Sequence, residues 1–238
     1  MSSSFVEALR STLHLLVTLD PQLLQIASLS LSVSAAATAI GTGLGLVLGA
    51  WIAVNQFPGR RAVLVVLNTL LALPSVVVGL LVYLLLSRAG PLGALGILFT
   101  PAAMVVAQTV LVLPIVTALS RQTIEDAMRD QGEQLRSMGA GRLGCALILL
   151  WDERMAMLTL ALAAFGRAIS EVGAVMIVGG NIEGVTRVMT TAIALETSKG
   201  DLPLALALGV VLLSIVLLLN ALIALLREWR VRADEAYA

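Results

Sequence analysis

The sequence predicts an all-α membrane protein with five transmembrane helices and an amino-terminal helix that lies on the membrane surface. Of the 238 residues, 59% are hydrophobic and only 13% are charged, well below the roughly 25% of soluble domains. Long charge-free segments recur at lengths that can cross a bilayer. One charged segment interrupts them and holds eleven of the thirty Asp, Glu, Lys and Arg residues.

The five spans follow from the lengths of the apolar segments, because a helix needs about 20 apolar residues to cross the hydrocarbon core. Four segments contain no charged residue, and a fifth is apolar but contains Arg167 and Glu171. The predicted spans are 26–54, 62–86, 97–119, 155–178 and 203–226. Together they form a transmembrane domain over residues 22–226, followed by a cytoplasmic tail over 227–238.

The first 21 residues have a different pattern. Apolar residues recur there at helical spacing, at Phe5, Leu9, Leu13 and Leu16. Polar residues lie between them, which predicts an amphipathic helix over residues 1–21 in the membrane interface. The segment lacks the basic start and the small-residue cleavage site of a signal peptide.

The distribution of Arg and Lys predicts the orientation, because cytoplasmic loops carry an excess of these residues. With the amino terminus outside, ten basic residues fall in cytoplasmic segments and four in outside segments. We therefore expect the amino terminus outside, the carboxyl terminus in the cytoplasm, and the charged segment 120–154 as a cytoplasmic loop.

Glycines and prolines within the spans predict local features of the helices. Gly41, Gly45 and Gly49 recur every four residues, which places them on one helical face and permits close approach of another helix. A nucleotide-binding loop is the alternative, but the uninterrupted apolar setting favours helix packing. Pro74 and Pro114 lie inside the second and third spans, where a proline tends to kink a helix. A role of these kinks in gating stays open.

Arg167 and Glu171 are unusual, because a charge at mid-span costs on the order of 2.5–3.5 kcal/mol on insertion scales. Their spacing of four residues predicts that they pair on one helical face. Two interpretations stay open. In the first, Arg167 offers a positive charge near the route of an anion, with Ser170, Glu171 and Asn181 as further candidate pathway residues. In the second, the ion pair only fixes helix packing.

The residue types present argue against several functions. A nucleotide-binding P-loop ends in Gly-Lys-Ser/Thr, but the only lysine lies in Ser198-Lys199-Gly200. If ATP drives the protein, another subunit must bind it. The single histidine, His14, leaves little room for acid–base catalysis near neutral pH. With Cys145 as the only cysteine, no intramolecular disulfide can form, and we expect neither a metal nor a cofactor on this chain.

The charged loop predicts a docking surface. Its first part is helical in composition, Gly139-Ala140-Gly141 breaks that helix, and a second short apolar helix begins near Arg142. Two short helices that meet at a glycine turn suit insertion into a groove on a partner protein.

The loop resembles the cytoplasmic signature of permease subunits of binding-protein-dependent ABC importers of the type I fold. That signature begins Glu-Ala-Ala, reaches Gly after three more residues, and reads Ile-x-Leu-Pro nine residues later. Glu133-Gln134-Leu135 and Gly139 occupy the first two places, and Leu149 to Asp152 occupy the last. The Glu and the Gly match, whereas the two Ala and the Pro do not. The resemblance implies ATPase coupling through Glu133, Gln134, Leu135, Met138, Gly139, Ala140, Gly141 and Arg142.

A second block is similar to the tungstate branch of the oxyanion permeases. It runs from Phe165 to Ile182, then through Thr186-Arg187 and on to Glu196. Molybdate and sulfate permeases have a related Arg-x-x-Gly-Glu-x-Gly block, in which Ser170 here replaces the first Gly.

The resemblance implies a non-catalytic subunit in the cytoplasmic (inner) membrane of a bacterium or archaeon. It implies a homodimer of permeases, an extracytoplasmic tungstate-binding protein, and two cytoplasmic ABC ATPase subunits that hold ATP and magnesium. Transport would proceed inward by alternating access. The alternatives are the same machine for molybdate, sulfate or another small solute, and an ATPase-independent secondary transporter. The odd number of spans and the lack of an evident internal repeat argue against the secondary transporter.

Overall fold

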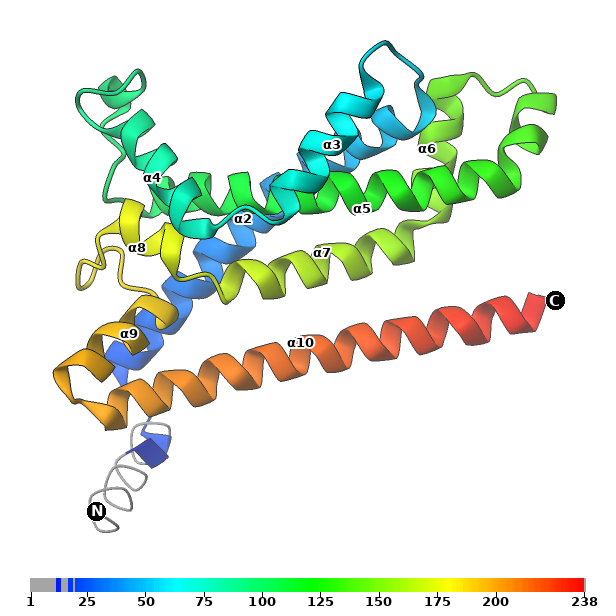
Figure 1. Cartoon of the computed structure of the whole chain (residues 1–238). Coiled ribbons are helices and arrows are strands. Elements are labelled where there is room, and N and C mark those ends of the chain that lie inside the picture. Colours follow the sequence, from blue (N-terminus) through cyan, green and yellow to red (C-terminus); the bar gives the residue numbers. More distant parts are fainter. Residues whose placement is uncertain (1–11, 14–16, 19, 238) are drawn as a thin grey trace. The chain divides into compact units, whose positions relative to one another are not determined.

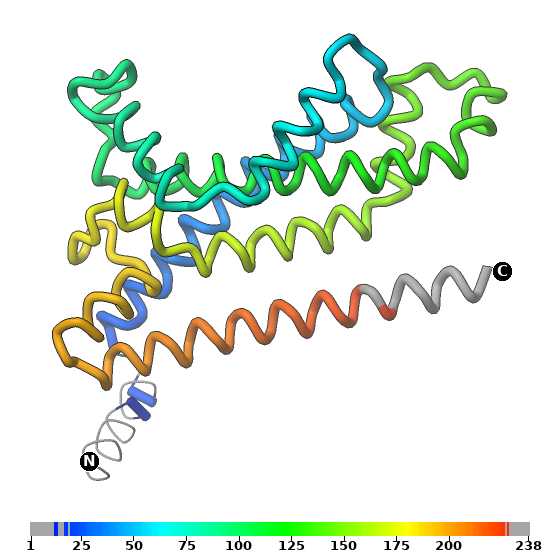
Figure 2. The backbone as a smooth tube through the Cα atoms, viewed as in Figure 1, coloured from blue at the N-terminus to red at the C-terminus, as the bar shows by residue number. Residues whose placement is uncertain are grey.

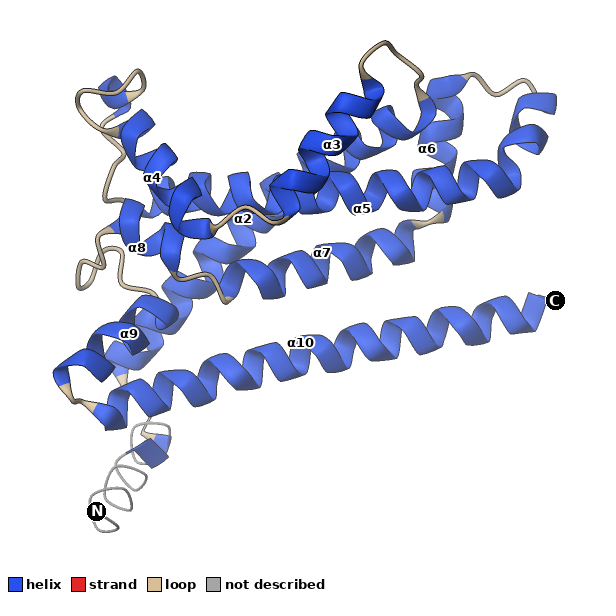
Figure 3. Ribbon diagram, in the orientation of Figure 1, coloured by secondary structure: helices blue, strands red, loops and turns tan. Residues whose placement is uncertain are grey.

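The computed structural model describes residues 12–13, 17–18 and 20–237, and this part of the chain contains helices and turns but no strand (Figure 3). The all-α prediction is therefore confirmed, whereas the interfacial helix predicted over 1–21 falls mostly outside the described residues. The helices in chain order (Figure 1) are α2 (Pro21–Val54), α3 (Arg60–Leu71), α4 (Ser75–Leu86), the 3₁₀ helix η1 (Gly93–Leu95), α5 (Pro101–Ser137), α6 (Arg142–Asp152), α7 (Arg154–Ile169), α8 (Gly173–Gly179), α9 (Met189–Lys199) and α10 (Leu202–Tyr237).

Three of the described helices are long and apolar enough to cross a membrane, namely α2, α5 and α10 over Leu202–Leu226. The pairs α3 with α4 and α7 with α8 pass the same test only when each pair counts as one broken span. The described chain therefore has three spans, or up to five. Helices suit these segments because the bilayer core offers no water to the backbone, so each N–H and C=O needs a partner within the segment.

The first long helix begins at a local cap. Pro21 occupies the first helical position, where its missing N–H is not needed. The Asp20 carboxylate accepts hydrogen bonds from the backbone N–H groups of Gln22 and Leu23, at 2.9 and 3.2 Å. An Asp side chain in this role satisfies donors that have no partner within the helix.

The two prolines inside the predicted spans behave differently. At Pro74 the helix ends altogether, since α3 stops at Leu71 and α4 starts at Ser75. The residue before a proline is driven out of the helical conformation, and the Pro74 carbonyl then accepts hydrogen bonds from Val77 and Val78 to start α4. Pro114, in contrast, lies inside α5, which continues through it to Ser137.

The contacts divide the chain into two compact units, and each is described by itself. The first unit contains the described residues up to Ala36, Pro74–Gln108 and Ala168–Leu218. Within it, α4 packs against α8 (Figure 1). Gly79 makes this approach possible, because a Cβ at that position would lie 2.7 Å from the Cα of Ala174.

The second unit contains Ala37–Leu73, Thr109–Arg167 and the chain from Leu219 onward. In this unit the glycine-bearing face of α2 contacts α5. A Cβ on Gly41, Gly45 or Gly49 would lie 2.8, 2.7 or 2.0 Å from the nearest atom of α5. The atoms it would meet belong to Val112, Val116 and Ser120. The interpretation of the glycines as a helix-packing face is therefore confirmed.

Candidate functional site

The charged loop is an ordered part of the second unit. We expected the first part of the loop to be a separate short helix. It is instead the continuation of α5, which runs to Ser137. Ile124 and Ala127 of this continuation form a buried cluster with Ala53, Leu149 and Met157. The cluster joins the end of α2 to α5, α6 and α7, because these apolar side chains leave water together.

The glycine turn of the loop is confirmed, and its geometry explains why glycine stands at position 139. Gly139 has a φ of +86°, which side chains with a Cβ rarely adopt. Its N–H donates to the carbonyl of Arg136 at 2.9 Å, and the N–H of Ala140 donates to the carbonyl of Leu135 at 3.0 Å. These two hydrogen bonds form a Schellman motif, which ends α5 and turns the chain toward α6 (Figure 2).

The turn presents most of the predicted coupling residues to solvent. Exposed residues of the set are Glu133, Gln134, Met138, Gly139, Gly141 and Arg142, whereas Leu135 and Ala140 are half-buried. The Met138 side chain is 76% exposed and projects from a turn otherwise rich in polar groups. The structure therefore brings the predicted coupling residues together on one turn.

Three of the four predicted pathway residues, Arg167, Ser170 and Glu171, flank the break between α7 and α8, whereas Asn181 lies beyond α8. The helix that carries Arg167 ends at Ile169, so the expectation that Arg167 and Glu171 share one continuous helical face is wrong. Glu171 is buried and its carboxylate accepts a hydrogen bond from the N–H of Ala174, in the first turn of α8. Arg167 and Ser170 are exposed, and Asn181 is half-buried.

The segment between α8 and α9 is held by side-chain hydrogen bonds within the first unit. The Thr186 hydroxyl donates to the carbonyl of Gly179 at 2.6 Å and accepts from the N–H of Ile182 at 2.9 Å. The Asn181 amide donates to the carbonyl of Thr191 at 3.3 Å. The Thr190 hydroxyl donates to the carbonyl of Glu171 at 2.8 Å. These bonds satisfy backbone groups that the helices leave open.

Sequence reasoning missed a buried ion pair in this segment. Arg187 and Glu196 are 8% and 5% exposed, and the Arg187 guanidinium lies 3.8 Å from the Glu196 carboxylate. Arg187 also contacts Glu183 at 3.3 Å, and Lys199 contacts Glu196 at 3.0 Å. In the sequence, this pair was indicated by the uncharged stretch between Arg187 and Glu196, which favours burial of the two residues that bound it.

Sequence reasoning also missed buried polar residues that join helices of the first unit. The Gln108 amide of α5 donates to the carbonyl of Ala168 at 2.9 Å. The Ser30 hydroxyl of α2 accepts from the N–H of Met189 at 2.7 Å. Neither residue belongs to a motif, so the sequence offered no sign of these partners.

Replacing Glu196 by glutamine is expected to destabilise the protein by about 2–3 kcal/mol. Removing one partner of a buried pair costs ~3–5 kcal/mol, and the loss is smaller here because Glu183 remains beside Arg187. Thermal unfolding of the purified protein measures the effect. Glu183→Gln is the matched control, since its side chain is 70% exposed and an exposed ion pair contributes less than about 1 kcal/mol. Equal melting temperatures of the two variants would contradict this assignment.

The comparison with known families decides the class of the protein. Residues 41–232 match the family described as "Binding-protein-dependent transport system inner membrane component". The chain belongs to this family. Its members are non-catalytic membrane permeases of ABC transporters, which agrees with the helical fold and with the absence of a P-loop from the sequence. The family description also states that its members are inner membrane components and that their transport depends on a binding protein.

Individual relatives are permeases for anions. The permease is 43% identical to "Tungstate uptake system permease protein TupB" of Peptoclostridium acidaminophilum, over 93% of this chain and 97% of the relative. It is 41% identical to TupB of Campylobacter jejuni, over 69% of each chain. A "Probable anion ABC transporter permease protein" of Haloferax volcanii is 43% identical over 74% of this chain and 78% of its own. A sulfate transport system permease of Synechocystis sp. is more distant, at 27% identity over 76% of this chain and 66% of the relative.

Proposed function

We propose that this permease carries tungstate inward as the membrane subunit of an ABC importer. The observation that carries the proposal is the similarity to TupB of Peptoclostridium acidaminophilum, which extends over nearly the whole of both chains. Sulfate permeases match at lower identity, so the closer similarity favours tungstate over sulfate. Molybdate and other small anions remain the alternative cargo.

The proposed topology has five spans. α2, α5 and α10 each cross the bilayer once, and each of the broken pairs, α3 with α4 and α7 with α8, forms one further span. The amino terminus is outside and the carboxyl terminus is cytoplasmic, because this arrangement places ten of the loop and tail arginines inside. Segment 120–154 then faces the cytoplasm, with an interfacial helix over 1–21 on the opposite side.

The proposed machine is a homodimer of this permease with two cytoplasmic ABC ATPase subunits and an extracytoplasmic anion-binding protein. ATP and magnesium reside on the ATPases. The turn around Gly139 is the coupling element, supported by the exposed Met138 and by the core that attaches the turn to α2 and α7. Movement of the ATPases would therefore shift several helices together, because close-packed interiors transmit displacement rather than absorb it.

The proposed pathway runs past the break between α7 and α8. Arg167 and Ser170 are exposed there. Placing a cation in an apolar span costs free energy, so a cation at such a position indicates a functional role such as an ion route. Glu171 borders the same break, and its hydrogen bonds also give it a structural role. Asn181 lies beyond α8, in the segment between α8 and α9. The permease would hold the anion weakly, since tight binding would slow release.

The decisive experiment measures uptake by vesicles that contain the permease, the ATPase and the binding protein. We expect labelled tungstate to accumulate only with ATP. Excess unlabelled tungstate should suppress this uptake more strongly than excess molybdate or sulfate does. Uptake without ATP or without the ATPase would instead indicate a secondary transporter. In the same vesicles, Arg167→Gln is expected to slow uptake about tenfold, the effect of ~1.4 kcal/mol on the barrier. Full uptake by this variant, with assembly intact, would remove Arg167 from the pathway.

A further inference from the structure

Two pockets adjoin each other in the second unit, where the end of α2 meets α5 and α6. One has a volume of about 310 Å³ and is lined by four arginines, Arg60, Arg129, Arg136 and Arg142, with Glu125 as its only acidic residue. The other has a volume of about 420 Å³ and is mainly apolar, lined by Val47, Trp51, Leu143, Leu147 and Leu150 among others. Val54 and Arg142 line both, so the two pockets share part of their walls.

The arginine-lined pocket carries unbalanced positive charge. Glu125 is already engaged by Arg60 and by Arg121, the latter at 2.6 Å. Arg129 pairs with Asp126 at 3.2 Å, and both side chains are exposed. Within the described part of the chain, neither Arg136 nor Arg142 has an ion pair or hydrogen bond from its guanidinium group. Two free guanidinium groups at one pocket favour an anion, to which they can donate several hydrogen bonds.

The apolar pocket next to it exposes large hydrophobic side chains. Leu143, Leu147 and Trp51 are 71%, 59% and 52% exposed. The Trp51 ring also packs against Phe57, with 5.1 Å between the ring centroids. Aromatic side chains are enriched at the level of lipid headgroups, where one edge meets water and the other meets hydrocarbon. The pocket therefore fits a hydrocarbon chain whose polar end lies toward Arg142.

We propose that the two pockets together bind one anionic phospholipid of the cytoplasmic leaflet. The phosphate lies against Arg136 and Arg142, and an acyl chain lies along Trp51, Leu143 and Leu147. A free inorganic anion would leave the apolar pocket unused, whereas a lipid matches both the charge and the apolar surface. Basic pockets beside membrane helices are known to hold anionic headgroups on the cytoplasmic side. The cytoplasmic placement rests on the proposed function, but the pocket chemistry does not.

A bound lipid would act on the coupling turn. Arg136 precedes Gly139 by three residues and Arg142 follows it by three, so a phosphate held by both bridges the two sides of the Schellman motif. Such a bridge favours one geometry of the turn, because the anion is lost when the two arginines separate. Anionic lipid would then raise the fraction of permeases that can engage an ATPase.

The test measures lipid binding to the purified full-length permease, without ATPase or binding protein. Phosphatidylglycerol, phosphatidylcholine and inorganic phosphate are titrated in turn, and bound lipid is counted by native mass spectrometry. We expect phosphatidylglycerol to bind, phosphatidylcholine to bind far more weakly, and phosphate to compete poorly. Arg136→Gln is expected to weaken phosphatidylglycerol binding about fivefold, which is the ~1 kcal/mol of one basic residue near an anionic surface. Trp51→Ala is expected to weaken it as well.

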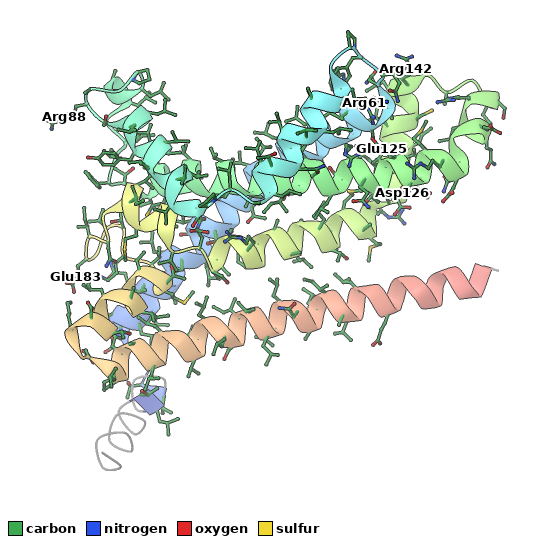
Figure 4. All side chains as sticks on the ribbon, viewed as in Figure 1. Arg61, Arg88, Glu125, Asp126, Arg142 and Glu183 are labelled. Carbon is green, nitrogen blue, oxygen red and sulfur yellow. The ribbon has the colours of Figure 1, made fainter. Side chains whose placement is uncertain are left out.

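Arg88→Gln is the matched control, because Arg88 is an exposed arginine of the first unit and lines neither pocket (Figure 4). Equal binding by the Arg136 and Arg88 variants would overturn the proposal. Equal affinity for the two phospholipids, or full displacement by phosphate at matched concentration, would overturn it too. Since no transport is measured, these results are independent of the cargo.

Discussion

Uptake by a permease with Gly139→Val is expected to fall about tenfold while its ATPase subunits continue to hydrolyse ATP. Gly139 has a φ of +86°, and the left-handed conformation costs residues with a Cβ roughly 1–2 kcal/mol. A β-branched side chain is a particularly poor fit there. A strain of this size lowers the population of the correct turn by a factor of about 5–30. ATP-dependent uptake and ATP hydrolysis, measured on the same vesicles, separate loss of coupling from loss of the ATPase.

Gly141→Val provides the control for this prediction. Gly141 lies two residues away, but its φ is −72° and its ψ is 172°, an extended conformation that valine adopts readily. At both positions an added Cβ would meet no atom within 4 Å, so backbone conformation is the difference between them. We expect the Gly141 variant to keep most of its uptake. Normal uptake by the Gly139 variant, with normal ATPase association, would remove the turn from the coupling mechanism.

Gly49→Ala is expected to destabilise the permease by about 3 kcal/mol, the upper range for overpacking of a well-packed interior. The new Cβ would lie 2.0 Å from the Ser120 hydroxyl and 2.7 Å from the backbone carbonyl oxygen of Thr117. The hydroxyl can rotate away, but the carbonyl cannot move without displacing α5. The two helices must therefore separate, which also weakens the hydrogen bond from Ser120 to the carbonyl of Gly45, now 3.3 Å long. Thermal unfolding in detergent measures the loss.

The same substitution at Gly43 is the control, because it lies in the same helix and its Cβ would meet nothing within 4 Å. Alanine is the better helix former by roughly 0.5–1 kcal/mol, so we expect Gly43→Ala to leave the melting temperature unchanged or to raise it. If both variants melt alike, the contact between α2 and α5 contributes little to stability. If Gly49→Ala alone melts lower, helix contact explains the spacing of four.

The course of the helices was largely predictable from the sequence. The apolar, nearly charge-free segments of spanning length are helices because lipid offers the backbone no hydrogen-bond partner. The glycine face of α2 predicted a helix contact because small residues let two helices approach closely. Pro74 and Pro114 show the limit of this reasoning. Both are prolines within apolar segments, yet only Pro74 ends a helix. Proline lacks a donor in either place, so local sequence does not distinguish a break from a tolerated site.

The candidate site was predictable only where its residues are neighbours along the chain. Gly139 was identified by its spacing from Glu133, and the turn at this glycine depends on hydrogen bonds within a few residues. The pairing of Arg167 with Glu171 was inferred from an unbroken helix, but α7 ends at Ile169, and the Glu171 carboxylate accepts a hydrogen bond from the first turn of the next helix. The Arg187–Glu196 pair was missed because a charged side chain is expected to be solvated until its burial is known.

Composition and segment length are local properties, so the amino-acid sequence alone indicated a helical membrane protein without a P-loop, and the resemblance of its loop motif to a known family indicated a permease. Which of the described charges are buried and which remain free became visible in the folded structure. Arg187 is enclosed beside Glu196, whereas Arg136 and Arg142 line a pocket open to a ligand. The free energy of a charge depends on its neighbours in space, and in the folded protein these neighbours include residues from distant parts of the chain.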